Sequence, residues 1–394
     1  MKISVGVLFG GKSVEHEVSV ISAVQAMNAL DSEKYDVVPI YITKDNLLYT
    51  SAEMLDIKAF TNIEGLLARS ENVFLSREGE RVVLTRVRPK KFGGNAVAYA
   101  DIFLPVVHGT NVEDGTLAGF LEMIGAPYCG CDVASSAIGM DKYAQKVLLR
   151  DAGVNVLDAV CFFGKDFFRD PGPVVAEIER KFGYPAIVKP LNSGSSVGIC
   201  VAHDKEALFD AIEEASAYSP RVLVERAIVN LREINCSVLG DAENVRASVL
   251  EEPLSTGDIL AYDDKYRGGS SKGMSSLSRK IPAEVTSEQE KAIKTMCIKA
   301  FKALGCCGVV RIDTMIDADT GEIYFNEINT IPGSLAFYLW EEAGLSFTDM
   351  LDEVIALGKK RSRERRALTF SYDVNLLSEV GARGIKGAKG KNGR

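Results

Sequence analysis

Histidine is scarce in this sequence, which has three among 394 residues, and neither a CxxC nor an HxxxH pattern occurs. Two close cysteine pairs, Cys129 with Cys131 and Cys306 with Cys307, therefore lack the partners of a typical zinc site. Apolar packing is the simpler interpretation, and a structural zinc ion is the alternative. Since no export signal is recognisable, the eight cysteines indicate reduced thiols instead of a disulfide framework.

Long apolar runs are missing as well. The longest, such as Ile102–Val107, are far shorter than the about 20 residues that a membrane-spanning helix requires. The first residues, MKISVGVLFGGKSVEHE, turn glycine-rich and charged too early for a signal peptide. A net charge of −8 argues against nucleic acid as the main partner. We therefore expect a cytoplasmic protein that binds neither membranes nor nucleic acids.

The composition is that of an ordinary globular protein, with 46% apolar and 25% charged residues. The length predicts two or three domains, at about 150 residues each. KISVGVLFGG has the pattern of a buried strand, and HEVSVISAVQAMNAL has apolar residues at helical spacing. Strands are also predicted at Tyr35–Ile42 and Ile102–Val107, separated by irregular and partly helical sequence. Together these segments indicate a parallel α/β sheet with binding residues on loops at strand ends.

The later sequence predicts a helix over 133–152 and then alternating strands and helices, up to a strand at 221–226. REINCSVLGD and NVRASVLEE form a predicted hairpin, joined near Gly240 and Asp241. Domain boundaries are expected near residues 138 and 226. From residue 359 the chain becomes a basic, glycine-rich tail that cannot fold alone. A solvated appendage and a segment that contacts anions both remain open.

Two loops rich in glycine and serine are candidate binding loops. VKPLNSGSSVG follows an apolar strand and offers backbone N–H groups to phosphates. It is not a Walker loop, because Lys189 precedes the glycines, and a merely flexible loop is the alternative. Lys142, in GMDKYAQK, would add a second cation if its helix packs nearby. The other loop, 260–278, has no apolar periodicity. A loop of this length is usually either a functional loop or a disordered segment, and both interpretations stay open.

The segments VVRIDTMID and YFNEIN place charged and amide side chains on two candidate strands. If both are strands, Arg311 and Asp313 share one face, as do Glu327 and Asn329. Side by side, these residues would supply oxygen ligands for one or two Mg²⁺ ions and a guanidinium for phosphates. Charged groups inside apolar strands are costly unless they are paired, so a buried salt-bridge network is the alternative.

Two loops near the N-terminal strands carry further polar groups. Glu15 and His16, in GGKSVEHEVSVISA, fall at a loop-to-helix junction, where a carboxylate can simply cap the helix. His108 follows the strand IFLPVV and precedes GTNVEDG. Two strand-end loops that each present a polar group indicate a substrate pocket.

Together, these motifs resemble the D-alanine:D-alanine ligase family, which has the ATP-grasp fold. The resemblance covers roughly residues 3–357. A Rossmann dehydrogenase is excluded because Gly6, Gly10 and Gly11 do not form GxGxxG after the first strand. The motifs that carry the resemblance, in family order, are GGKSVEHEVSVISA, HGTNVEDG, MDKYAQK, VKPLNSGSSVG, VLVERAIVNLREI, YDDKY, RID and NEINTIPG.

The resemblance implies a three-domain ATP-grasp architecture of the α/β and α+β classes, with an N-terminal parallel α/β domain. The implied divisions are 1–137, 138–225, 226–358 and a basic tail at 359–394. In this family the γ-phosphate of ATP passes to the carboxylate of a first D-alanine, and the amine of a second D-alanine attacks the acyl phosphate. The product, D-alanyl-D-alanine, is a peptidoglycan precursor. The family also implies a homodimer.

The same resemblance implies ATP and metal sites between the central and C-terminal domains. Asp313, Glu327 and Asn329 match ligands of Mg²⁺ or Mn²⁺, with two ions expected. Lys142 and Lys189 match the positions that hold phosphates. Glu225 and Glu233 match the positions that bind adenine and ribose. The ATP-binding positions are Lys142, Lys189, Ser195, Ser196, Glu225, Glu233 and Lys265.

For the first D-alanine, Glu15 matches the carboxylate that anchors the ammonium group, and His108 would lie beside the same substrate. Ser195 and Tyr266 match hydrogen-bonding partners that order this end of the pocket and help to deprotonate the incoming amine. The YDDKY segment around Tyr266 is similar to that of dipeptide-forming members, which favours an amine nucleophile.

For the second substrate, Arg311 and the N–H of Gly333 match the donors that stabilise the tetrahedral oxyanion. After the glycine, family members usually carry a Ser/Thr-rich stretch whose serine binds the carboxylate of the acceptor. This chain has Tyr338 at that position and Ser334 directly after the glycine. A tyrosine hydroxyl also donates, but it reaches further than a serine hydroxyl. Gly333, Ser334 and Tyr338 are therefore the predicted acceptor-binding residues.

Three functions stay open at this point. The first is D-alanine:D-alanine ligase, and the second is a related carboxylate–amine ligase with another acceptor, such as D-serine or another amino acid. The third is a non-catalytic nucleotide-binding protein. The complete set of metal ligands and phosphate lysines argues against the third function.

Overall fold

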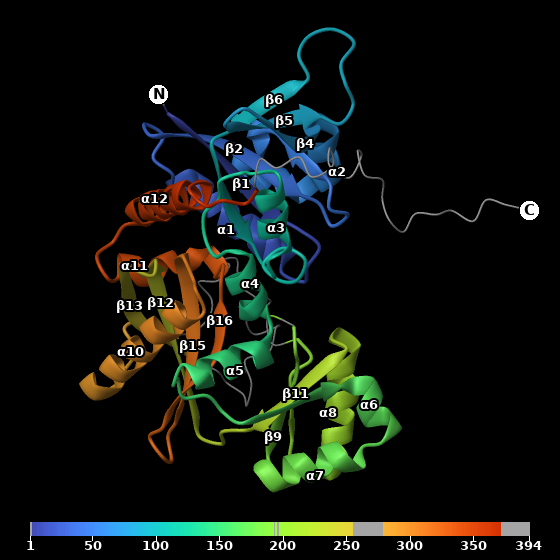
Figure 1. Cartoon of the computed structure of the whole chain (residues 1–394), viewed down its shortest axis with the longest axis vertical. Helices are drawn as coiled ribbons and strands as arrows, with labels where there is room; N and C mark the ends of the chain where they lie inside the picture. Colours follow the sequence, from blue (N-terminus) through green and yellow to red (C-terminus); the bar gives the residue numbers. More distant parts are fainter. Residues whose placement is uncertain (1, 193, 195–196, 255–278, 372–394) are drawn as a thin grey trace, which may run out of the picture.

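The structure is a computed structural model, and it describes residues 2–192, 194, 197–254 and 279–371. Its described strands form three sheets of seven, four and five strands. Figure 1 shows the N-terminal sheet, in blue to cyan, at one end of the molecule. The five-stranded sheet, in olive to orange, lies below it at mid-height, and the four-stranded sheet, in green to yellow-green, lies at the opposite end.

The N-terminal domain is built on the seven-stranded sheet. Its elements are β1 (Ile3–Gly10), α1 (His16–Ala29), β2 (Tyr35–Ile42), β3 (Leu48–Thr50), η1 (Ala52–Leu55), η2 (Ile57–Asn62), α2 (Ile63–Arg69), β4 (Glu71–Glu78), β5 (Arg81–Arg86), β6 (Ala96–Ala100), β7 (Ile102–Val107) and α3 (Thr116–Met123). The strand order is β6-β5-β4-β3-β2-β1-β7.

Only part of this sheet is parallel. β1 pairs in parallel with β2 and β7, so the predicted strands at Tyr35–Ile42 and Ile102–Val107 are confirmed with their bounds. The other neighbours pair antiparallel. The stretch predicted as irregular between β2 and β7 holds four strands. Two of them, β4 and β5, carry exposed charged residues where they join, Arg77, Glu78 and Arg81, which interrupt the apolar pattern.

The central part of the chain forms a four-stranded antiparallel sheet of order β10-β9-β11-β8. Its elements are α4 (Val133–Met140), α5 (Lys142–Asp151), β8 (Ala159–Phe163), α6 (Gly164–Arg169), α7 (Gly172–Lys181), β9 (Ala186–Pro190), β10 (Cys200–Ala202), α8 (Lys205–Tyr218) and β11 (Arg221–Arg226). The single helix predicted over 133–152 is two helices. Asp141 ends the first in extended conformation and caps the second by accepting from the N–H groups of Tyr143 and Ala144.

The C-terminal part forms a five-stranded antiparallel sheet of order β14-β13-β12-β15-β16. Its elements are β12 (Leu231–Gly240), β13 (Val245–Pro253), β14 (Arg279–Lys280), α10 (Ser287–Ala303), β15 (Gly308–Asp317), β16 (Ile323–Asn329), η4 (Gly333–Ala336), α11 (Phe337–Glu341) and α12 (Phe347–Arg366). The predicted hairpin is confirmed, with β12 and β13 joined at Gly240 and Asp241.

Helix α12 connects this last sheet to the N-terminal domain (Figure 1). Its apolar face shares one buried cluster with β1 and α11, in which Phe9, Trp340 and Met350 are members. The predicted tail boundary at residue 359 therefore falls inside a helix that continues to Arg366. Likewise, the predicted division between residues 137 and 138 falls inside α4.

All eight cysteines lie in the described residues and are free thiols, six of them buried. Among the described residues, no three His, Cys, Asp or Glu side chains are grouped to hold a metal ion. Cys129, Cys131 and Cys306 belong to buried apolar clusters, and Cys307 is also buried. No helix in the described ranges is both long and apolar enough to cross a membrane.

Candidate active site

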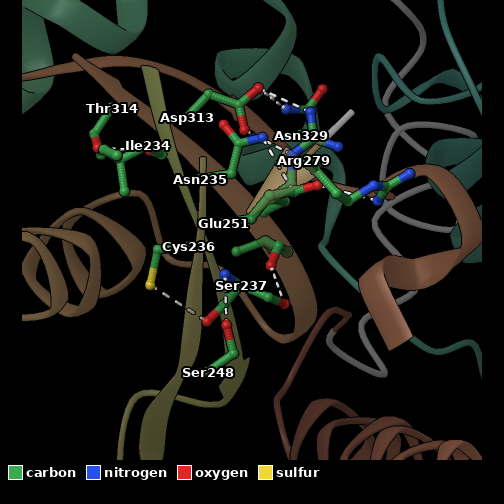
Figure 2. A network of polar contacts seen from close by, with 12 residues as sticks. Ile234, Asn235, Cys236, Ser237, Ser248, Glu251, Arg279, Asp313, Thr314 and Asn329 are labelled. Atoms are coloured by element: carbon green, nitrogen blue, oxygen red, sulfur yellow. Dashed lines mark hydrogen bonds and ion pairs between the residues drawn. The ribbon is translucent and has the colours of Figure 1, made fainter. Parts of the chain in front are cut away.

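Two adjacent strands bring the predicted metal ligands together. β15 and β16 pair antiparallel, with Asp313 opposite Glu327 and Arg311 opposite Asn329. The Arg311 guanidinium donates to both carboxylate oxygens of Asp313, at 2.7 and 2.8 Å. Asn329 Nδ2 donates to Asp313 Oδ2 at 3.1 Å (Figure 2). Burial alone would lower the pKa of Arg311, but the Asp313 carboxylate raises it well above its ordinary value.

Two lysines approach β16 from the central part of the chain. Lys142, the first residue of α5, has its Nζ 3.1 Å from Glu327 Oε2. Lys189, on β9, donates to Asn326 Oδ1 at 3.1 Å. Helix α5 and strand β9 therefore each place one predicted phosphate lysine beside the strand that carries predicted metal ligands.

Glu225, on β11, lies between two lysines. Its side chain is fully buried, one oxygen contacts Lys189 Nζ, and the other lies 2.7 Å from Lys146 Nζ. Burial alone would raise the pKa of Glu225, but the two ammonium groups outweigh it and lower the pKa to about 2. Burial lowers the pKa of Lys146. Lys146 was not predicted as a site residue, although it follows Lys142 by one helical turn and so lies on the same face of α5.

Several family-based assignments stay predictions. Both oxygens of Glu225 face lysines, and Glu233 is a half-buried residue of β12. These observations do not test the predicted binding of adenine and ribose by the two glutamates. The roles predicted for four further residues, and for the loop at 260–278, concern positions outside the described residues. These four are Ser195, Ser196, Lys265 and Tyr266.

Glu15 and the glycine-rich loop meet on the N-terminal side of the site. A Cβ atom built on Gly194 would lie 2.8 Å from Glu15 Oε2, so the loop backbone approaches this carboxylate closely. The Glu15 side chain makes no capping hydrogen bond to α1, which weighs against the capping interpretation. Both residues line one cavity together with Lys142, Glu327 and Asn329. One predicted substrate residue, one predicted phosphate lysine and two predicted metal ligands thus share a cavity.

His108 connects the N-terminal domain to the segment before Gly333. Its Nδ1 lies 2.8 Å from the Ile331 carbonyl oxygen, and its Nε2 lies 3.2 Å from Ser22 Oγ. A neutral ring with the proton on Nδ1 donates to Ile331 and accepts from Ser22. Burial lowers the pKa of His108, which favours this neutral form. His16 is instead buried and hydrogen-bonded within the N-terminal domain.

The turn after Gly333 has an unusual backbone. In η4, Ser334, Leu335 and Ala336 have φ values of 49°, 52° and 51°, which lie in the left-handed region. For non-glycine residues this conformation costs about 1–2 kcal/mol each. The N–H of Ser334 donates to Ser22 Oγ at 2.8 Å, and its hydroxyl donates to Gln25 Oε1 at 2.7 Å. Helix α1 therefore holds the turn that contains two of the predicted acceptor-binding residues.

Tyr338 belongs to a polar cluster below this turn. Its hydroxyl donates to Glu251 Oε2 at 3.0 Å, and burial raises its pKa. The Arg279 guanidinium lies 4.6 Å from the ring centroid and donates to Glu251 Oε1 at 3.0 Å. Figure 2 shows Glu251 with Arg279 and Asn235 beside it. Acceptor binding by Ser334 and Tyr338 remains a prediction.

Glu113 also lines the cavity, although its sequence position carried no predicted role. Burial and the nearby charge of Glu15 raise the pKa of Glu113 to about 7, even though backbone hydrogen bonds oppose the shift. Its place in HGTNVEDG, five residues after His108, was the available signal.

Comparison with known proteins settles the family. Residues 4–131 match the family described as D-ala D-ala ligase N-terminus, and residues 148–356 match D-ala D-ala ligase C-terminus. The chain belongs to the D-alanine–D-alanine ligase family. The predicted family, the ATP-grasp fold class and the prediction of a ligase are therefore confirmed.

Relatives of this ligase family match nearly the whole chain. A D-alanine--D-alanine ligase from Caldicellulosiruptor bescii is 40% identical over 381 residues, covering 94% of this chain and 99% of its own. Among solved structures, the VanG D-Ala:D-Ser ligase from Enterococcus faecalis is 33% identical, with a TM-score of 0.75 over 91% of this chain and all of the other. The D-alanine-D-alanine ligase from Coxiella burnetii is 28% identical, with a TM-score of 0.76 over 97% and 99%.

The ligase site has oxygen ligands that suit a hard divalent cation. Asp313 and Glu327 contribute carboxylates and Asn329 an amide from neighbouring strands, and such oxygens are the ligands that Mg²⁺ prefers. Each carboxylate also faces a cation of the protein, Arg311 or Lys142. The residues present therefore fit a divalent metal beside phosphate groups.

Proposed function

We propose that this protein joins two D-alanines to D-alanyl-D-alanine, with conversion of ATP to ADP and phosphate, and so supplies a precursor of peptidoglycan. One observation carries the proposal. The cavity that contains Glu15 also contains Lys142, Glu327 and Asn329, so an amino-acid anchor and a phosphate and metal site are adjacent. Such adjacency is what transfer of a phosphoryl group to an amino-acid carboxylate requires.

In the first step, a carboxylate oxygen of D-alanine attacks the γ-phosphorus of ATP, and ADP leaves. Lys142 and Lys189 would hold phosphate oxygens, and Glu15 would bind the ammonium group of the substrate. Asp313, Glu327 and Asn329 would hold Mg²⁺ or Mn²⁺, which neutralises phosphate charge when it is bound. Glu225 contacts the Lys189 ammonium group, which also donates to Asn326.

In the second step, the amine of another D-alanine attacks the acyl carbon, and phosphate leaves. Arg311 and the N–H of Gly333 would stabilise the oxyanion of the tetrahedral intermediate. Two hydrogen bonds to Asp313 fix the orientation of the Arg311 guanidinium, which supports this role. His108 and Ser22 hold the backbone on either side of Gly333.

An alternative is a ligase whose acceptor is D-serine or another amino acid. The similarity to a D-Ala:D-Ser ligase and the position of Tyr338 both support it. Acceptor discrimination depends on which groups reach the hydroxyl or methyl group of the second substrate. The predicted acceptor turn differs from the usual Ser/Thr-rich pattern, so the acceptor has to be measured.

Two assays separate the functions. Phosphate release from ATP with Mg²⁺ and D-alanine as sole amino acid would support a ligase, whereas its absence would support a non-catalytic nucleotide-binding protein. Equimolar D-alanine, D-serine and D-lactate should then be offered together, and the products identified by mass spectrometry. D-Alanyl-D-alanine as the main product supports the proposal, and D-alanyl-D-serine supports the alternative.

The proposal extends to the assembly and location of the enzyme. Family membership supports a homodimer in the cytoplasm, where the nucleotide is available. Light scattering after size-exclusion chromatography would test the dimer, and a single-chain mass of 42.7 kDa would contradict it.

A further inference from the structure

Glu113 is a buried carboxylate to which the two proposed steps give no role. It lies in the loop between β7 and α3 and is 9% exposed. Its Oε2 accepts the N–H of Gly109 at 3.1 Å, within the same loop. Its Oε1 accepts the N–H of Ile331 at 2.9 Å and the hydroxyl of Thr330 at 3.2 Å. Burying a carboxylate is costly without such donors, so these three contacts account for its position.

The two contacts of Oε1 join distant parts of the chain. Thr330 and Ile331 are 217 and 218 residues from Glu113 in sequence. They directly follow β16, which carries the predicted metal ligands, and they lead into Gly333. Glu113 therefore ties the N-terminal domain to the segment between the phosphate site and the predicted oxyanion donor.

A second set of contacts holds the same segment from α1 and from the start of the Glu113 loop. The His108 ring donates to the Ile331 carbonyl oxygen, and Ser22 Oγ accepts the N–H of Ser334. The peptide groups of Ile331 and Ser334 are thus fixed on either side of Gly333. Pro332 has no N–H to contribute, and none of these contacts uses the N–H of Gly333.

We propose that Glu113 is a positioning residue for the second step, because it fixes 330–333 so that the Gly333 N–H is directed at the developing oxyanion. The inference rests on the proposed function. Catalysis is sensitive to such placement, since a displacement of about 1 Å can cost about 10²-fold in rate. The first step, transfer of the γ-phosphoryl group, forms no oxyanion on carbon and does not need this donor.

Two substitutions separate positioning from proton transfer. Glu113→Ala removes the acceptor for Ile331 and Thr330 and should lower the kcat of dipeptide formation about 10²-fold. Glu113→Gln keeps an oxygen for Ile331, giving up only the contact with Gly109, and should recover most of this loss. If Glu113 instead transferred a proton, both variants would lose activity equally, because neither alanine nor glutamine can do so. An inactive Glu113→Gln would therefore overturn the proposal.

The first step, measured by itself, distinguishes a specific loss of the second step from a general loss of activity. ATP labelled with ¹⁸O in its β,γ-bridge scrambles the label when the acyl phosphate forms reversibly in the presence of D-alanine. Glu113→Ala should keep this exchange and the KM for ATP within about twofold of the wild type while dipeptide formation falls. Equal losses of exchange and dipeptide, or no loss of either, would overturn the proposal.

A matched control is Asp114→Ala. Asp114 is in the same loop, and in the contacts that the structure describes its oxygens accept only the N–H groups of Asn111, in the loop, and of Thr116, the first residue of α3. Its exchange-to-dipeptide ratio should equal that of the wild type. If Glu113→Ala does not fold, Thr330→Val removes one donor and should shift the ratio in the same direction. A wild type that makes no dipeptide would defeat the proposed function itself, which is a separate outcome.

Discussion

Replacement of Glu225 by glutamine should destabilise the protein by about 3–5 kcal/mol at pH 7, because it leaves buried ammonium groups without a counter-charge. The carboxylate is fully buried and contacts Lys146 and Lys189. Its pKa is about 2 instead of its ordinary 4.5. At about 1.4 kcal/mol for each pKa unit, the difference between 4.5 and about 2 corresponds to about 3.5 kcal/mol of ion pairing, which lies within the expected range.

The direction of the pH dependence follows from the lowered pKa. Because Glu225 has a lower pKa in the folded protein than in the unfolded chain, its stabilisation is fully present above about pH 4.5. It is lost as the pH falls from about 4.5 toward about 2. The stability difference between the wild type and Glu225→Gln should therefore be constant near neutral pH and should shrink in acid.

Urea unfolding followed by circular dichroism at pH 7 and pH 3 would measure both effects. The control is Glu177→Gln, which breaks a surface pair with Lys181 at 3.0 Å on α7 and should cost less than about 1 kcal/mol. A difference below about 1 kcal/mol for Glu225→Gln at pH 7, or the same difference at both pH values, would refute the reasoning.

Three further substitutions test the site and its supports. Arg311→Ala should lower dipeptide turnover about 10²–10³-fold while nucleotide binding persists, measured by steady-state kinetics and calorimetry, and near-normal turnover would refute its role. Gly139→Ala should lower the free energy of unfolding by about 1–2 kcal/mol in urea, because its Cβ would lie 2.6 Å from Thr330 Cγ2. Ala336→Gly, at φ 51°, should leave the melting temperature unchanged or raise it, since relief of backbone strain offsets one lost methyl group.

The fold could be predicted where burial leaves a simple pattern. β2 and β7 are the two parallel neighbours of β1 and are mostly buried, so their bounds were correct. The antiparallel strands β4 and β5 expose charged side chains, so their apolar pattern is interrupted and they were not predicted. The break between α4 and α5 depends on one side chain, Asp141, whose capping hydrogen bonds compete with helix continuation.

The site could be predicted where family motifs named its residues, and the structure brings Lys142, Lys189 and the two carboxylate strands together as expected. Lys146 and Glu113 were not assigned. Their roles depend on partners that only folding supplies, since Lys146 meets Glu225 and Glu113 meets Ile331 from far along the chain. No local pattern encodes such pairs.

The left-handed turn of η4 has a consequence for attempts to change the acceptor. Its backbone is unfavourable for Ser334, Leu335 and Ala336, and its hydrogen-bonding partners are Ser22 and Gln25 of α1. Substituting the turn alone would change side chains while the helix still dictates the backbone path. Libraries intended to alter the acceptor should therefore randomise the turn and these two helix positions together, because their effects on the enzyme will not be additive.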